Sequence, residues 1–188
     1  MEQKAWIIDE KTAKQYLTVE DAIDCVEKTW KWYGEGRVIM PNKITTDMSE
    51  LGVAGWFNSM PAYIGPMDVA GIKVVGGYDG NKALGLPYIK ANVLITDSKT
   101  GILVGRISGD HIKDRGTGAQ PAVMARLLAA KTDVVTIIGT GLQGYMSLLC
   151  MSKVLDMKEI RVCDISEAAM DRFIARFPDA PFRFVKCK

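Results

Sequence analysis

The first 35 residues carry a helical pattern of hydrophobic and polar positions. Residues 9–17 predict one short helix. Thr18 supplies a helix N-cap, and apolar residues then recur at helical spacing, which predicts a second helix over residues 19–34. These recurring residues are Ile23, Val26 and Trp30. Two helices are therefore expected at the start of the chain.

The period changes in the stretch that follows, where Gly, Pro and Asn separate short β-rich runs. These runs predict strands over residues 69–75, 88–96 and 102–107. The last two are expected to form a hairpin, because residues 97–101, Asp-Ser-Lys-Thr-Gly, have typical turn chemistry. Up to this point the pattern indicates a mixed α+β region.

A capping-box pair, Thr117 and Gln120, predicts the start of a connector helix over residues 118–131. After Asp133 the pattern changes again, and strands and helices alternate. The expected elements are a strand over 134–138, a helix over 142–154, a strand over 160–163, a helix over 166–177 and a strand over 182–185. Such alternation is typical of a parallel sheet with crossover helices, so the fold class is α/β, with a partial Rossmann (βαβαβ) unit after the α+β region.

Composition narrows the classes of protein. Lys and Arg total 24 against 22 Asp and Glu, and a net charge of +2 gives no basic surface of the kind that binds nucleic acid. No apolar run approaches the roughly 20 residues that span a bilayer, and the first residues lack the apolar segment of a signal peptide. We therefore expect a cytoplasmic protein with neither nucleic acid nor a membrane as partner. Reduced thiols and no metal site are expected, because the four cysteines stand far apart in the sequence, at Cys25, Cys150, Cys163 and Cys187.

The strongest chemical motif is a glycine loop at residues 139–144. A GxGxxG pattern alone is weak, but here it directly follows a buried strand and opens a helix. Gly139 permits the tight turn, Gly141 lets the backbone approach a pyrophosphate, and Gly144 allows the helix to pack close to the sheet. The residues predicted to bind the cofactor in this loop are Gly139, Thr140, Gly141, Leu142, Gln143 and Gly144.

Asp164 completes this predicted cofactor site. It ends the second strand of the unit, 25 residues after Gly139, where a carboxylate can accept hydrogen bonds from the adenosine ribose hydroxyls. Its negative charge would repel a 2′-phosphate, which favours NAD over NADP. The alternative is a structural glycine-rich turn in which Asp164 caps the next helix.

Lys73 lies inside an apolar run, Val69-Ala-Gly-Ile-Lys-Val-Val75, so its ammonium is partly desolvated and needs an anionic partner or a lowered pKa. Either outcome suits a site for a substrate carboxylate. The alternative is an edge-strand lysine whose stem covers apolar surface.

Lys43 and Arg115 are further candidate anion ligands, with a solvated surface charge as the alternative for each. His111, the single histidine, is expected to be structural.

In their serial order, these motifs resemble the ornithine cyclodeaminase and mu-crystallin family, which is also similar to archaeal-type alanine dehydrogenases and to ketimine reductases. The resemblance runs along nearly the whole chain. It rests on Met40-Pro-Asn-Lys43, Met60-Pro-Ala-Tyr63, Gly71-Ile-Lys-Val-Val75, Gly85-Leu-Pro87, Asp97-Ser-Lys-Thr-Gly101, Thr117-Gly-Ala119 and the glycine loop.

The resemblance implies roles for the three basic residues Lys73, Lys43 and Arg115. In the family, a lysine in the Gly-x-Lys strand contacts the substrate carboxylate near the reacting carbon, so Lys73 is the expected catalytic and substrate-binding residue. Lys43 stands where the family often has an arginine, and a lysine would bind the carboxylate as a point charge. Arg115 is shifted by one from the family's arginine, because Gly116 stands before the Thr-Gly-Ala motif.

The implied activity is oxidation of an L-amino acid at Cα by hydride transfer to NAD, with imine formation and ammonia release, as in a cyclodeaminase. Alanine dehydrogenase or ketimine reductase activity, a non-catalytic mu-crystallin-like nucleotide-binding protein and an inactive fragment remain alternatives. A homodimer is expected, as in the family. Residues 1–131 would form the substrate-binding and dimerisation domain and residues 132–188 the first half of the NAD-binding domain, so the length indicates a truncated or split product.

Overall fold

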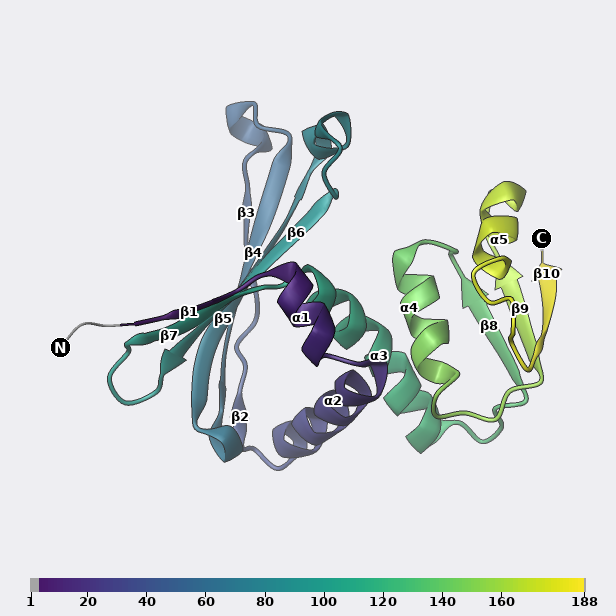
Figure 1. Ribbon diagram of the computed structural model, residues 1–188, viewed down its shortest axis with the longest axis horizontal. Helices are drawn as coiled ribbons and strands as arrows, with labels where there is room; N and C mark the ends of the chain where they lie inside the picture. Colours follow the sequence, from purple (N-terminus) through teal and green to yellow (C-terminus); the bar gives the residue numbers. More distant parts are fainter. Residues whose placement is uncertain (1–3, 188) are drawn as a thin grey trace. The chain divides into compact units, whose positions relative to one another are not determined.

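The computed structural model describes residues 4–187, which divide into two units. Unit 1 comprises residues 4–17 and 28–113, and unit 2 comprises residues 18–27 and 114–187 (Figure 1). The predicted domains 1–131 and 132–188 stay a prediction, and their outermost residues, 1–3 and 188, lie outside the described residues. In the described part of the chain, no helix is long and apolar enough to cross a membrane.

Two helices near the N-terminus confirm the helical pattern of the first 35 residues. They are α1 (Glu10–Tyr16) and α2 (Val19–Gly34). The Asp9 side chain caps α1 by accepting a hydrogen bond of 2.7 Å from the Thr12 amide. At the start of α2, the amide of Asp21 donates to the Thr18 hydroxyl at 3.1 Å and the Asp21 carboxylate accepts from the Thr18 amide at 3.1 Å.

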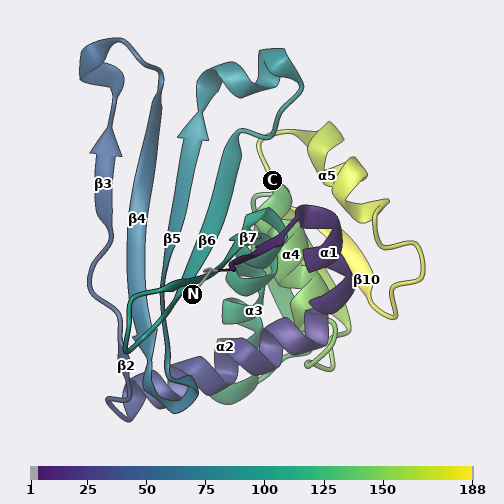
Figure 2. The same cartoon turned by 60° about the vertical axis from the view of Figure 1, so that its left-hand side comes forward.

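A mixed sheet forms most of unit 1, with the strand order β1-β7-β6-β5-β4-β2 and with β3 paired to β4. Figure 2 shows β3, β4, β5 and β6 side by side. Among the described residues its strands are β1 (Trp6–Ile8), β2 (Val38–Ile39), β3 (Ile44–Asp47), β4 (Gly55–Ile64), β5 (Val69–Tyr78), β6 (Ile89–Asp97) and β7 (Leu103–Ser108). Short 3-10 helices lie between them at Ser49–Leu51, Gly65–Met67 and Asp79–Leu84.

The predicted hairpin is confirmed by β6 and β7, which pair antiparallel. Its turn is fixed by the Asp97 carboxylate, which accepts hydrogen bonds from the Thr100 amide at 2.8 Å and hydroxyl at 2.6 Å. Strand β4 was not among the predicted strands, although it pairs with β5 over ten positions. Pro61 and the polar residues Asn58 and Ser59 interrupt its apolar alternation, and only its neighbours in the sheet make it a strand.

The predicted start of the connector helix is wrong. Helix α3 spans Asp110–Leu128, so the supposed cap residue Thr117 lies inside it and Pro121 is an internal proline. The helix begins earlier because the Asp110 carboxylate accepts a hydrogen bond from the Ala91 amide at 2.8 Å, which ties this end to β6. The small residues of the Thr-Gly-Ala motif serve packing instead, since a Cβ on Gly118 would lie 2.7 Å from the backbone of Met146.

The parallel sheet of unit 2 confirms the predicted βαβαβ unit. Its strand order is β10-β9-β8, and both pairings are parallel. Its elements are β8 (Val134–Ile138), α4 (Leu142–Met151), β9 (Glu159–Cys163), α5 (Glu167–Ile174) and β10 (Arg183–Cys187). The central strand supplies the core, because Ile160 and Val162 are fully buried together with Leu148 of α4 and Phe173 of α5.

Candidate functional site

The glycine loop joins β8 to α4 in the conformation that its sequence predicts. Gly139 has a φ of 91°, a left-handed conformation that side chains disfavour. A Cβ on Gly144 would lie 2.1 Å from the carbonyl oxygen of Gly139, so only glycine fits at this close approach of helix and turn. Both glycines are thus required by the backbone itself.

Gly141 differs from these two glycines, because a Cβ there would meet no described atom within 4 Å apart from its chain neighbours. Its φ of −72° and ψ of −168° are also open to other residues, so the fold does not require glycine at this position. Among residues 4–187, no side chain caps the N-terminus of α4, which begins at Leu142. The first-turn amides and the helix dipole there suit a phosphate group, and Gly141 leaves space for it.

Asp164 connects the glycine loop to the end of β9. Its Oδ2 accepts hydrogen bonds from the Thr140 amide at 2.7 Å and hydroxyl at 2.6 Å, and its Oδ1 accepts from the Ser166 amide at 3.0 Å. These bonds, led by the Thr140 hydroxyl, lower the pKa of Asp164 to about 2. The carboxylate is therefore ionised at neutral pH. Ser166, not Asp164, caps α5, since its hydroxyl accepts from the Ala169 amide at 3.2 Å.

A pocket of about 320 Å³ lies beside Asp164. It is lined by Asp164, Ile165, Glu167, Met170, Lys186 and Cys187. The Ile165 side chain is fully exposed, and Met170 adds a buried apolar surface. A carboxylate next to apolar side chains can bind a ribose together with its base, so the loop and this pocket together fit the adenosine half of a dinucleotide.

We predict that the ionised Asp164 makes the stability of the protein fall in acid. Its pKa is lowered on folding, so its contribution is complete above the unfolded value of about 3.9 and is lost as the pH falls toward about 2. Asp164→Asn should therefore reduce stability at pH 7 and weaken the loss between about pH 4 and 2, as measured by urea unfolding. Asp179→Asn, at an exposed carboxylate of the same unit, is the control. If Asp164→Asn and the parent lose the same free energy of unfolding between about pH 4 and 2, Asp164 is not the source of the acid sensitivity.

Lys73 lies in β5 with Met60 of β4 and Val93 of β6 as its register partners. The side chain is half-buried on the face of the sheet that these apolar residues share. Burial lowers the pKa of Lys73, and the positive charges of Lys113 and then Lys43 lower it further. A desolvated ammonium with cationic neighbours is a favourable place for an anion.

The structure thus brings together two of the three predicted substrate-binding cations, Lys73 and the exposed Lys43. Lys113 was missed, because the expected cap at Thr117 placed it in a loop instead of in α3. Arg115 lies in unit 2, two positions after Lys113 and so on roughly the opposite face of α3. Burial raises the pKa of Cys150 to about 11, and the positive charge of Arg115 opposes this rise.

His111 is structural, since its Nε2 donates to the Leu17 carbonyl oxygen at 3.1 Å.

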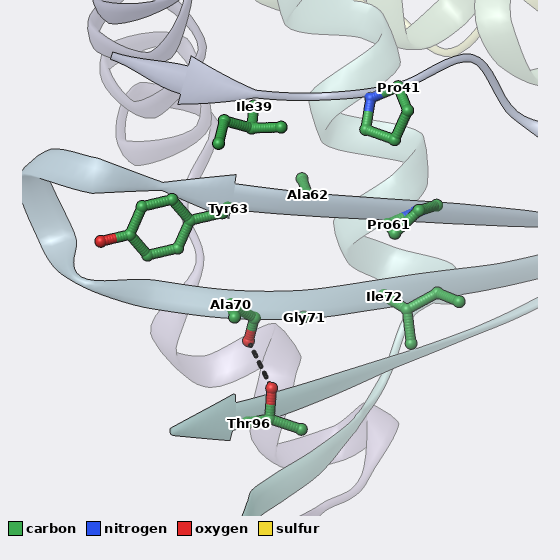
Figure 3. Close-up of a pocket in the computed structure, with 9 residues that line it drawn as sticks. All are labelled: Ile39, Pro41, Pro61, Ala62, Tyr63, Ala70, Gly71, Ile72 and Thr96. Atoms are coloured by element: carbon green, nitrogen blue, oxygen red, sulfur yellow. Dashed lines mark hydrogen bonds between the residues drawn. The ribbon is translucent and has the colours of Figure 1, made fainter. Parts of the chain in front are cut away.

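The opposite face of the unit 1 sheet holds a different kind of pocket. Figure 3 shows its lining, which comes mainly from β4 and β5 and from the segment around β2. Its volume is about 410 Å³, and most of its side chains are apolar. The Thr96 hydroxyl donates to the Ala70 carbonyl oxygen at 3.4 Å, so this polar group is satisfied within the sheet. The pocket offers apolar surface and no charged group.

A comparison with known proteins decides the relationship. The sequence pattern of the ornithine cyclodeaminase/mu-crystallin family matches residues 4–188. The chain belongs to this family. Among curated family relatives, it is 28% identical over 174 residues to alanine dehydrogenase of Archaeoglobus fulgidus, covering 92% of this chain and 52% of that protein. It is 27% identical over 140 residues to the ketimine reductase mu-crystallin of Mus musculus, covering 74% and 44%.

Solved family structures confirm the predicted fold class. An archaeal alanine dehydrogenase dimer with bound NAD superposes with a TM-score of 0.89 and 25% identity, covering 98% of this chain and 56% of that one. A lysine cyclodeaminase, solved to explain recognition of L-lysine, L-ornithine and L-2,4-diaminobutyric acid, has a TM-score of 0.83 and 27% identity, covering 98% and 56%. The chain therefore spans about half the length of the relatives that it matches.

Proposed function

We propose that the chain is part of an NAD-dependent amino-acid oxidoreductase of the ornithine cyclodeaminase type. The reaction would remove hydride from Cα of an L-amino acid, form an imine and release ammonia. The observation that carries the proposal is the half-buried Lys73, which has a lowered pKa and two further lysines as neighbours. Such a group is suited to a carboxylate, which all amino acids share.

In this proposal, the residues of unit 1 bind and orient the substrate. The Lys73 ammonium would bind the substrate carboxylate, with Lys43 and Lys113 adding positive charge around it. The lowered pKa of Lys73 also lets its Nζ release a proton more readily than an exposed lysine could. Arg115 stays a proposed substrate ligand. NAD, when bound, supplies the acceptor of the hydride.

The residues of unit 2 fit the cofactor. The amides of Leu142 and Gln143 would face the pyrophosphate across the space at Gly141, and Thr140, whose amide donates to Asp164, would hold the loop in place. The Oδ1 of Asp164 accepts one hydrogen bond, from the Ser166 amide, so this oxygen can accept a second one from a ribose hydroxyl. Its ionised carboxylate would repel the 2′-phosphate of NADP. Solved family members that hold NAD support the choice of this cofactor.

A net dehydrogenase is the second candidate, because the similarity to the Archaeoglobus alanine dehydrogenase extends over 92% of this chain.

We expect turnover of one amino acid when the protein is incubated with NAD and ornithine, lysine, alanine or arginine. Ammonia without net NADH would identify cyclodeamination, since the hydride returns to the ring, whereas equal amounts of both would identify a dehydrogenase. Calorimetry measures NAD binding in the same protein. If NAD binds but neither ammonia nor NADH forms, the result would support a mu-crystallin-like binding protein and contradict the enzyme proposal.

We also propose that the protein is a cytoplasmic homodimer. The apolar pocket in Figure 3 and the exposed Trp6 and Ile7 of the edge strand β1 offer surface for a second copy. The solved archaeal relative is itself a dimer.

A further inference from the structure

Two cysteines that are distant in the sequence stand side by side in unit 2. Cys163 is the last residue of β9 and Cys187 the last residue of β10, and the register of the parallel pair places them directly opposite each other. Figure 1 shows these two strands as neighbours at the edge of the small sheet. Both are free thiols and both are half-buried. Burial, and next the contact with Cys187, raise the pKa of Cys163.

The spacing of the strands allows these cysteines to form a disulfide. Paired residues of neighbouring strands point to the same face of the sheet and lie about 4.8 Å apart. Disulfides span Cα separations of about 4.4–6.8 Å, so the backbone does not have to move far. Cys150, in contrast, is fully buried in α4, and Cys25 is exposed on α2.

A small oxidant can reach this pair. Cys187 lines the pocket of about 320 Å³ beside Asp164, so this residue borders open space. Cys163 directly precedes Asp164 in the chain, and its raised pKa keeps it protonated at neutral pH. The thiol that borders the pocket therefore meets an oxidant first, and the neighbouring thiol of Cys163 lies within reach to resolve the product.

We propose that Cys163 and Cys187 are a redox-sensitive dithiol, which a hydroperoxide converts to an intramolecular disulfide. The Cys187 thiol gives up its proton as its sulfur attacks one peroxide oxygen, the O–O bond breaks, and the leaving hydroxide takes up that proton, so that a sulfenic acid and water form when hydrogen peroxide is the oxidant. The Cys163 sulfur then attacks the Cys187 sulfur, the S–O bond breaks and a second water leaves. The two sulfurs together lose two electrons and the peroxide gains them, and a dithiol reductant reverses the bond.

The location gives the disulfide a consequence that rests on the proposed function. Bond formation draws the two sulfurs together to about 2.05 Å at the wall of the pocket beside Asp164. If the pocket holds the adenosine end of NAD, the oxidised protein should bind NAD several-fold more weakly than the reduced protein.

The test is to treat the protein with a slight excess of hydrogen peroxide, block free thiols, and map disulfides by mass spectrometry without reduction. We expect a Cys163–Cys187 cross-link, with loss of two hydrogens, that dithiothreitol removes. Cys163→Ser and Cys187→Ser should each abolish it, whereas Cys25→Ser should retain it. Oxidation of the single cysteines without this cross-link, or disulfides between chains only, would overturn the proposal.

NAD binding is measured on the same samples by calorimetry. A cross-linked protein with reduced NAD affinity supports the proposal and its consequence, and an unchanged affinity overturns the consequence. If the reduced protein binds no NAD but still forms the cross-link, the proposed function fails and the dithiol assignment stands. The two readouts therefore separate the two proposals.

Discussion

Replacing Lys73 with methionine should weaken carboxylate binding and at the same time make the protein more stable. A hydrogen bond to a charged group contributes about 1.5–3 kcal/mol, so the affinity for an amino acid should fall roughly ten- to a hundredfold. The fold, however, loses a half-buried ammonium whose charged form is disfavoured by desolvation and by two neighbouring lysines. Calorimetric titration with L-ornithine and pyruvate measures the first effect, and urea unfolding measures the second.

The pH dependence of stability gives this prediction a sign that a fully solvated lysine would not show. Because the pKa of Lys73 is lowered on folding, the folded protein binds fewer protons than the unfolded chain below the unfolded value of about 10.4. Stability should therefore rise as the pH increases toward that value, and Lys73→Met should lose this rise.

Lys90 of β6 is a matched control, because its ammonium forms an ion pair with Asp110. Lys90→Met removes a cation from the same sheet but leaves the partner carboxylate behind. We expect this variant to lose stability and to bind carboxylates as the parent does. Equal losses of binding in the two variants would show that Lys73 contributes only general positive charge.

The sequence predicted unit 2 well because its decisive features are local. The apolar run of β8, the glycines of the loop and the alternation of strands and helices each depend on residues close together in the chain. Asp164 could be predicted for the same reason, since its place at the end of a strand follows from the pattern.

The features that could not be predicted depend on pairing between distant segments. The start of α3 is decided by the hydrogen bond from Ala91 to Asp110, and this bond exists only once β6 is in place. The proximity of Lys113 to Lys73 follows from that start. Likewise, Cys163 and Cys187 meet through the register of β9 and β10, which no spacing in the sequence reveals.

Gly144→Ala should be the most damaging substitution in the glycine loop. The new Cβ would lie 2.1 Å from the Gly139 carbonyl oxygen and 3.2 Å from Cγ2 of Ile137, so the turn and the helix must separate. Overpacking of this kind costs about 1–3 kcal/mol, and the displaced α4 should bind NAD at least about tenfold more weakly. Urea unfolding and calorimetric titration with NAD measure the two losses.

The same glycine-to-alanine change at two other positions separates fold from function. Gly116→Ala adds a Cβ inside α3 that meets no described atom within 4 Å apart from the adjoining residues of the helix, so helix propensity should raise stability by about 0.5–1 kcal/mol and leave NAD binding unchanged. Gly141→Ala should leave stability within about 0.5 kcal/mol of the parent, because its backbone and surroundings accept a methyl group. Its NAD affinity should nevertheless fall, since the methyl group would stand where the pyrophosphate passes. A Gly141→Ala variant that binds NAD as tightly as the parent would contradict this placement of the cofactor, whatever Gly144→Ala does.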